Sequence, residues 1–168
     1  MKVFLLGLMG SGKTFWKNEL AAKLKLTAYD LDQLIVAVEE ASIPEIFESS
    51  GEVYFRKTEA KVLRWFAEKK SFVLATGGGA PCFHHNMEWM NQQGITIWLD
   101  EPVSVLTERL ENETANRPLL KNLDKEGLKQ YLEKQLEERS TFYNQAKIRV
   151  RGDQINLKNL MSKIKEYA

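Results

Sequence analysis

The sequence predicts an α/β fold built of βαβ units around a parallel sheet. Short apolar runs alternate with longer segments of helical periodicity along the 168 residues, which is the pattern of such units. A glycine-rich turn at residues 7–14 joins the first apolar run to the first helical segment, and a glycine triplet at 77–79 follows a later run. The sequence shows no linker and no internal repeat, so residues 1–168 are expected to form one domain.

The strands are predicted from short runs of large apolar residues. Val3–Leu6 is apolar throughout, which is typical of a strand buried on both faces of a parallel sheet. Further strands are predicted at Ala28–Tyr29, Phe72–Ala75, Ile95–Leu99 and Ile148–Val150.

Helices are predicted between these strands, where apolar residues recur at helical spacing, as do Leu20, Ala21 and Leu24. Gly51 separates two helical segments, and Pro102 begins another. The predicted helices are Thr14–Leu24, Leu34–Glu40, Ile43–Phe47, Val53–Phe66, Phe83–Gln93, Val103–Leu110, Leu128–Glu138 and Leu157–Tyr167.

Residues 111–124 interrupt this alternation. The segment is polar, contains three asparagines and shows neither the helical nor the strand period. Loops of this length inside a compact domain are usually functional or disordered, so we expect a mobile flap here.

Composition excludes several classes of protein. The chain carries 24 Lys and Arg against 23 Asp and Glu, a net charge of +1, whereas nucleic-acid-binding proteins usually have a basic excess. The longest apolar run, Val3–Met9, is much shorter than the roughly 20 residues that span a bilayer. One cysteine, Cys82, cannot form an intramolecular disulfide. We therefore expect a cytoplasmic protein with neither nucleic acid nor membrane as a partner.

Residues Gly7–Thr14 match the phosphate-binding pattern G-x-x-x-x-G-K-[ST], placed between a predicted strand and a predicted helix. Glycines allow successive backbone N–H groups to point into one concavity, and the helix N-terminus adds partial positive charge. Lys13 is expected to reach the β- and γ-phosphates, and the Thr14 hydroxyl to ligate Mg²⁺. Gly10, Ser11 and Gly12 form the rest of the cradle, and Phe15 can add its backbone N–H.

Two aspartates compete for the second acidic position of such a site. Asp100 ends an apolar strand, but Asp100-Glu101-Pro102 is also a typical helix N-terminus, and we prefer the capping interpretation. Asp30, at the end of the second strand, is the better candidate to orient magnesium-bound water.

Four further features suggest a binding pocket for a hydroxyl-bearing anion. Asp30 and Asp32 follow a strand end, where open α/β sheets bind ligands. Arg56 lies in an otherwise apolar helical segment, the triplet 77–79 exposes bare backbone, and Arg139 lies near the end of a charged helix. Each has a simpler interpretation: a helix N-cap, an ion-paired surface arginine, or a tight turn.

Taken in order, these motifs resemble the shikimate kinase family along nearly the whole chain. The resemblance rests on residues 7–14, Asp30-Leu31-Asp32, 42–47, 51–56, Thr76-Gly77-Gly78-Gly79, 117–120, and Arg139 with Tyr143. It implies a three-layer αβα P-loop kinase fold, similar to nucleoside monophosphate kinases. That fold has a central five-stranded parallel sheet and a lid, here at about 111–124.

The resemblance also implies roles on the acceptor side. Asp32 would bind the ring hydroxyls of shikimate and position the attacking 3-hydroxyl, or act as its base. Arg56 and Arg139 would hold the shikimate carboxylate, a task suited to the planar guanidinium group. The backbone of Gly77, Gly78 and Gly79 would contact the ring.

On the nucleotide side, the resemblance implies ATP as co-substrate with Mg²⁺. Arg117 would reach the transferring phosphoryl group as the lid closes, and Arg109 would lie near the adenine. Lys13, Asp32 and Arg117 are thus the expected catalytic residues, with Thr14 and Asp30 at the metal. The implied reaction gives shikimate 3-phosphate and ADP, and a monomer is expected.

The sequence departs from the usual pattern of the family after the phosphate loop. Phe15-Trp16-Lys17 stands where a hydroxyl residue and then a small glycine are usual, and Thr141 stands where proline is common. Two other hypotheses remain open: a kinase for another small polyol acid or a nucleotide, and a non-catalytic nucleotide-binding module. Nucleotide acceptors would leave the Arg56 and Arg139 pair unexplained, and a non-catalytic module need not retain Lys13, Asp32 and Arg117.

Overall fold

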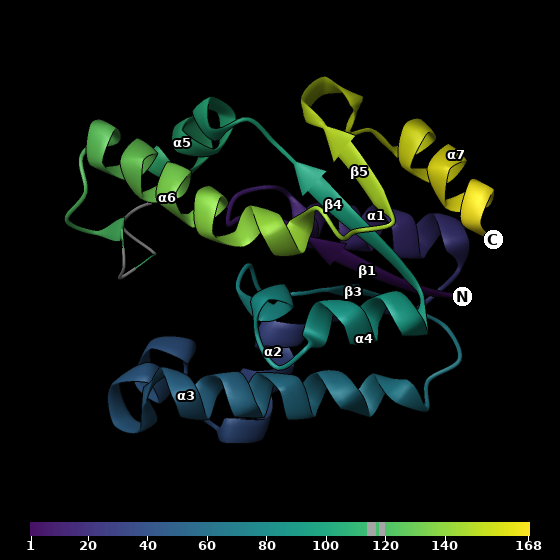
Figure 1. Cartoon of the computed structure of the whole chain (residues 1–168), viewed down its shortest axis with the longest axis horizontal. Helices are drawn as coiled ribbons and strands as arrows, with labels where there is room; N and C mark the ends of the chain where they lie inside the picture. The colour runs from purple at the N-terminus through teal and green to yellow at the C-terminus, as the bar shows by residue number, and fades with distance from the viewer. Residues whose placement is uncertain (114–116, 118–119) are drawn as a thin grey trace.

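A computed structural model describes residues 1–113, 117 and 120–168. Within these residues the strands form one fully parallel sheet in the order β2-β3-β1-β4-β5. The α/β class and the parallel sheet predicted from the sequence are confirmed (Figure 1). The strands are β1 (Lys2–Leu6), β2 (Ala28–Asp30), β3 (Phe72–Ala75), β4 (Ile95–Asp100) and β5 (Ile148–Arg151).

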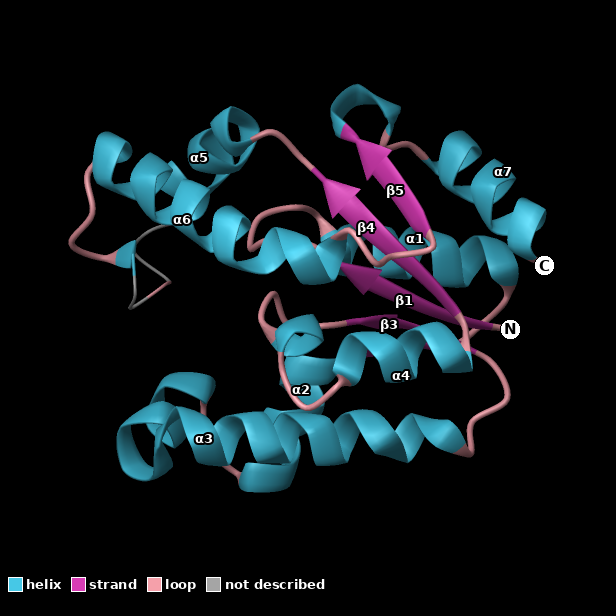
Figure 2. Ribbon diagram, viewed as in Figure 1, coloured by secondary structure: helices cyan, strands magenta, loops and turns pink. Residues whose placement is uncertain are grey.

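Helices cover both faces of the sheet, which gives the three layers that the family resemblance implied (Figure 2). The helices are α1 (Lys13–Leu24), α2 (Leu31–Glu39), α3 (Ile43–Arg64), α4 (Asn86–Gln93), α5 (Val103–Glu111), α6 (Lys125–Tyr143) and α7 (Leu157–Tyr167). Short 3₁₀ turns lie at Trp65–Ala67, Ala80–Cys82 and Gly152–Gln154.

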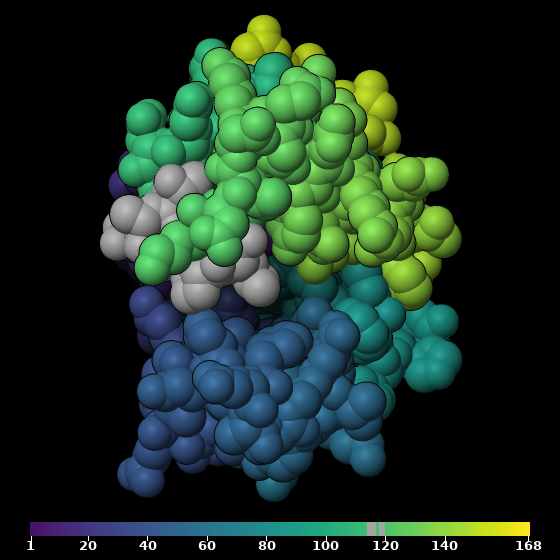
Figure 3. Space-filling view, turned by 90° about the vertical axis from the view of Figure 1, so that its left-hand side faces the viewer, coloured from purple at the N-terminus to yellow at the C-terminus, as the bar shows by residue number. Residues whose placement is uncertain are grey.

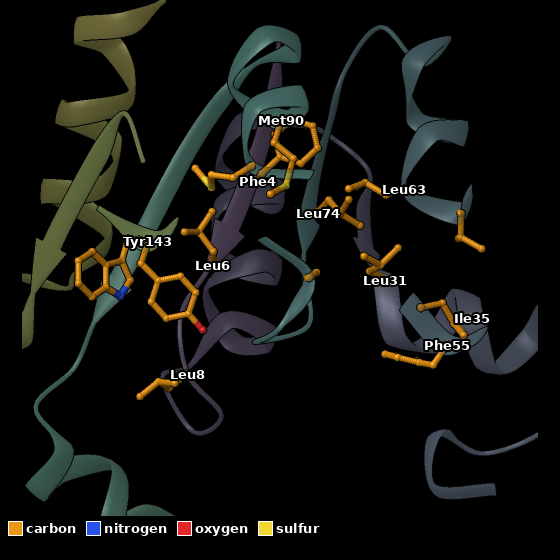
Figure 4. Close-up of a cluster of buried hydrophobic side chains, with 14 of the residues drawn as sticks. Phe4, Leu6, Leu8, Leu31, Ile35, Phe55, Leu63, Leu74, Met90 and Tyr143 are labelled. Carbon is orange, nitrogen blue, oxygen red and sulfur yellow. The ribbon is translucent and has the colours of Figure 1, made fainter. Parts of the chain in front are cut away.

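The alternation of side chains along β1 divides the core into two parts. Val3 and Leu5 face α1 and α7, whereas Phe4 and Leu6 face the cluster formed by α2 to α6. Figure 4 shows Phe4 and Leu6 in this larger cluster, and the side chain of Tyr143 lies there too. Because β1 is buried on both faces, the loop that follows it starts from a rigid position.

The helix predictions hold in outline but fail at three starts and one end. Helix α6 runs from Lys125 to Tyr143 rather than from Leu128 to Glu138, because the Asp124 carboxylate caps it by accepting from the Gly127 N–H. Gly51, with φ of 82°, breaks the helical geometry within α3, as predicted for two segments. Helix α4 begins at Asn86 rather than Phe83, because His84 and His85 adopt left-handed backbone angles. Helix α2 begins at Leu31 rather than Leu34, because the Asp30 carboxylate caps it by accepting from the Gln33 N–H.

The predicted flap lies between α5 and α6. Residues 114–116 and 118–119 of that segment lie outside the described residues. No helix in the described part of the chain is long and apolar enough to cross a membrane.

Candidate active site

The phosphate loop connects β1 to α1 at the carboxyl edge of the sheet. Gly7, Gly10 and Gly12 have φ angles of 147°, 79° and 90°, which L side chains rarely adopt. A Cβ at Gly7 would also lie 2.8 Å from the Leu99 carbonyl oxygen and 2.9 Å from Ser11 Oγ. The glycine spacing of the motif is therefore demanded by backbone geometry as well as by close packing.

Lys13, the first residue of α1, is directed back over this loop. Its Nζ donates to the carbonyl oxygens of Gly7 at 2.7 Å and Leu8 at 2.9 Å. Burial lowers the pKa of Lys13 to about 8, and the negative charge of Asp32 opposes this shift. Near pH 7 the ammonium group is mostly charged and is placed to meet an anion in the loop.

Thr14 and Asp30 come together as the predicted metal pair. The Thr14 hydroxyl donates to Asp30 Oδ2 at 3.5 Å, and Asp30 Oδ1 accepts from the Gln33 N–H at 3.2 Å. The geometry therefore allows Asp30 both to cap α2 and to take part in a metal site with Thr14. Hydroxyl and carboxylate oxygens beside a phosphate loop fit Mg²⁺, which prefers oxygen ligands and takes the remainder from water and phosphate.

The capping interpretation of Asp100 is wrong. The residue that caps α5 is Pro102, with no side-chain hydrogen bond, whereas the Asp100 carboxylate lies 2.7 Å from Arg149 Nη2 and 3.6 Å from Arg151 Nε. The carboxylate pairs with arginines of the neighbouring strand β5, a contact that is invisible in the local sequence.

Asp32 lies in the first turn of α2, against the glycine turn. A Cβ at Gly77 would be 2.9 Å from Asp32 Oδ1, so the carboxylate touches bare backbone there. Burial and the nearby charge of Asp30 raise the pKa of Asp32, while Lys13 and Arg56 lower it. A carboxylate with a raised pKa beside an ammonium group is suited to accept a hydrogen bond or a proton from a hydroxyl.

The two predicted clamp arginines meet at the glycine triplet. A Cβ at Gly79 would lie 2.5 Å from Arg56 Nη2, and one at Gly78 would lie 2.7 Å from Arg139 Nη1. Arg56 comes from α3 and Arg139 from α6, so helices on two sides of the turn contribute the two guanidinium groups. Figure 3 shows the hollow that separates α3 from α6 on this face.

Arg109 and Arg117 lie at the other end of the site. Arg109 Nη1 donates to the Gly10 carbonyl at 2.9 Å and Nη2 to Glu101 at 3.0 Å, so it borders the phosphate loop. Arg117 Nη2 donates to Glu113 at 3.3 Å. Its positive charge contributes to lowering the pKa of Lys13.

A cavity of about 1000 Å³ connects these groups. Most of the predicted site residues line it, namely Gly10, Gly12, Lys13, Thr14, Phe15, Asp30, Asp32, Gly77, Gly78, Arg109 and Arg117. Arg56 and Arg139 border the glycine triplet rather than lining this cavity. The predicted phosphate-binding residues therefore share one cavity with Asp32, Gly77 and Gly78, and the two arginines adjoin it at the glycine triplet.

Comparisons with known proteins show the family to which the chain belongs. The family model described as shikimate kinase matches residues 9–168. The chain belongs to the shikimate kinase family. A shikimate kinase of Azobacteroides pseudotrichonymphae genomovar. CFP2 is 43% identical over 148 residues, which cover 88% of this chain and 87% of that protein.

Solved shikimate kinases have the same fold. The crystal structure from Bacteroides thetaiotaomicron has a TM-score of 0.88 and 35% identity, covering 99% of this chain and 95% of that one. The shikimate kinase of Acinetobacter baumannii, solved in complex with shikimate, has a TM-score of 0.85 and 36% identity, covering 98% and 90%. These similarities agree with the five-stranded parallel sheet seen here.

Two residues beside the predicted site received no role from the sequence, although Tyr143 is among the residues that carry the family resemblance. Glu59 is 1% exposed, and its Oε1 accepts from Arg56 Nη1 at 3.0 Å, while its Oε2 has no hydrogen-bond partner among the described residues. Burial raises the pKa of Glu59 to about 7, against the opposing effect of Arg56. The spacing of three residues from Arg56 on one helix was the signal that could have found it.

Tyr143 is the second such residue. Its hydroxyl donates to the Gly78 carbonyl at 2.6 Å, and its ring is fully buried beside Trp98, with ring centroids 5.4 Å apart. The tyrosine, which lies on α6, therefore holds the middle residue of the glycine triplet. No local sequence signal pairs residues so far apart in the chain.

Proposed function

We propose that this chain transfers the γ-phosphoryl group of ATP to the 3-hydroxyl of shikimate, giving shikimate 3-phosphate and ADP. This reaction belongs to the pathway of aromatic amino-acid synthesis. One observation carries the proposal: the glycine triplet is flanked by Arg56, Arg139 and the Asp32 carboxylate. Gly77 and Gly78 of this triplet line the same cavity as the phosphate loop. The two guanidinium groups can hydrogen-bond to the substrate carboxylate, and the buried Asp32 carboxylate can accept hydrogen bonds from the ring hydroxyls.

On the nucleotide side, the loop N–H groups from Gly10 to Phe15 would bind the phosphates, with Lys13 against the β- and γ-phosphates. Arg117 would add positive charge at the transferring group. Positive charge placed where negative charge spreads over the phosphoryl oxygens stabilises the transition state of this reaction. Arg109, bordering the loop at Gly10, would contact the nucleoside.

Thr14 and Asp30 would hold Mg²⁺, Thr14 directly and Asp30 through water. The ion, when bound, neutralises phosphate charge. Their separation of 3.5 Å and the hard oxygen donors support this assignment.

On the acceptor side, Asp32 would orient the attacking hydroxyl and accept its proton, which its raised pKa favours. Arg56 and Arg139 would fix the substrate carboxylate, and the backbone of Gly77, Gly78 and Gly79 would lie against the ring. Residues 111–124 would act as the lid that excludes water. We further propose a monomer in the cytoplasm, which size-exclusion chromatography and cell fractionation would test.

The deciding experiment measures ADP release from Mg-ATP with and without shikimate. Gluconate and nucleoside monophosphates serve as control acceptors. We expect turnover that depends on shikimate alone. Release of ADP that no small acid stimulates would contradict the proposal and would support a nucleotide-binding module instead.

An arginine variant tests the acceptor site separately. Arg56→Ala should raise KM for shikimate by roughly 100-fold, because a charged hydrogen-bond partner of the carboxylate is lost. Affinity for ATP should remain near normal. Lys57→Ala, an exposed neighbour on the same helix, is the matched control and should leave both constants unchanged.

A further inference from the structure

Lys17 is a buried lysine on α1, next to the proposed metal pair. The residue is 6% exposed, which is uncommon for lysine. Its Nζ lies 4.0 Å from Asp30 Oδ2, the same oxygen that accepts from the Thr14 hydroxyl. A buried ammonium group is costly without a partner, so this carboxylate stabilises it.

The Asp30 carboxylate is thereby shared between two hydrogen-bond donors and the ammonium group of Lys17. Oδ1 accepts from the Gln33 N–H at 3.2 Å, while Oδ2 faces both Thr14 and Lys17. The negative charge of Asp30 therefore already has the positive charge of Lys17 beside it. A second cation at the same place gains less attraction from Asp30 and is repelled by Lys17.

We infer that Lys17 competes with Mg²⁺ for Asp30 and that this chain therefore binds its nucleotide with a reduced dependence on Mg²⁺. This inference rests on the proposed function, because it takes the metal position from Thr14 and Asp30. Lys17 is a positioning residue here, acting on the ion through a carboxylate. It does not touch the reacting atoms in this arrangement.

The test compares ADP affinity with and without the ion by isothermal titration calorimetry. The measured quantity is the ratio of the ADP Kd in EDTA to the ADP Kd in saturating Mg²⁺. Lys17→Met keeps the buried aliphatic stem and removes the charge. We expect it to increase this ratio by roughly threefold to tenfold relative to the wild type, as removal of a unit charge close to a divalent ion should.

Two controls isolate the charge. Lys17→Arg retains a cation at this position, and Lys23→Met removes an exposed lysine of the same helix. Both should keep the wild-type ratio. A ratio in Lys17→Met that equals or falls below the wild-type value would overturn the inference, because a lysine that merely packs in the helix affects both affinities alike.

A measurement on the wild type covers the case in which Lys17→Met does not fold. The Lys17 side-chain ¹⁵N resonance, assigned by its loss in Lys17→Arg, should shift when Mg²⁺ is added to the ADP complex. An unchanged resonance would also overturn the inference. Neither measurement uses shikimate, so a wild type that lacks shikimate-dependent turnover would refute the proposed function separately.

Discussion

The contact between Gly79 and Arg56 allows a substitution that should impair shikimate binding without straining the backbone. Gly79 has φ of −88° and ψ of −13°, which alanine adopts without strain. An alanine Cβ would nevertheless lie 2.5 Å from Arg56 Nη2, 2.8 Å from Nη1 and 2.9 Å from Cζ. Van der Waals contact at this site begins near 3.4 Å, so the guanidinium must move by almost 1 Å.

That movement displaces the proposed carboxylate ligand and weakens its ion pair with the buried Glu59 carboxylate, so some stability is lost as well. The guanidinium is fixed by Glu59 at 3.0 Å and lies 4.3 Å from the ring centroid of Phe83, so the displaced position lacks this support. A misplacement of about 1 Å in a binding group can cost on the order of 100-fold in rate. We expect kcat/KM for shikimate to fall by that factor in Gly79→Ala.

The assay is steady-state ADP release with shikimate and ATP varied in turn, together with thermal unfolding. The KM for ATP should stay near the wild-type value, whereas the Tm should fall modestly, because the shifted guanidinium loses part of its ion pair with the buried Glu59. The double variant Gly79→Ala/Arg56→Ala should be no worse than Arg56→Ala alone, because the clash disappears with the guanidinium. A Gly79→Ala enzyme with unchanged KM and kcat for shikimate would refute the reasoning.

Three other predictions concern the same site. Lys13→Ala and Asp32→Ala should each reduce kcat by at least ~100-fold, comparable to the loss of one transition-state contact; near-normal turnover in either variant would defeat the role of that residue. Tyr143→Phe removes the 2.6 Å hydrogen bond to the Gly78 carbonyl, which should lower the free energy of unfolding by about 1 kcal/mol and raise KM for shikimate more than KM for ATP. An equal rise in the KM for shikimate and the KM for ATP would indicate a structural role only. The pKa of Glu59 is raised from 4.5 to about 7 in the folded protein. Between these pH values Glu59 is deprotonated in the unfolded chain but retains its proton in the folded chain. The contribution of Glu59 to stability therefore falls as pH rises from 4.5 to about 7. Chemical denaturation of Glu59→Gln across this range should show a shallower fall with pH than the wild type, and identical slopes would exclude Glu59 as the source.

Local sequence determined much of the nucleotide side. The spacing of Gly7, Gly10, Gly12, Lys13 and Thr14 specifies backbone angles and a helix N-terminus within eight residues, so the cradle follows from the chain order alone. The alternation of apolar runs with helical segments likewise predicted the parallel sheet. The loop angles and the helical and strand periods arise between neighbours in sequence, whereas strand pairing joins distant residues such as Lys2 and Phe72.

The acceptor side was decided by the tertiary structure. The family pattern predicted roles for Arg56 and Arg139, which lie 83 positions apart in the chain. Only the packing of α3 and α6 around the glycine triplet brings their side chains to adjacent glycines. The partners of Asp100 and Gly78 come from β5 and α6. Burial, together with the negative charge of Asp32, raises the pKa of Glu59. Such contacts depend on which elements pack across the sheet, and the desolvation that tunes charged groups exists only once that packing has excluded water.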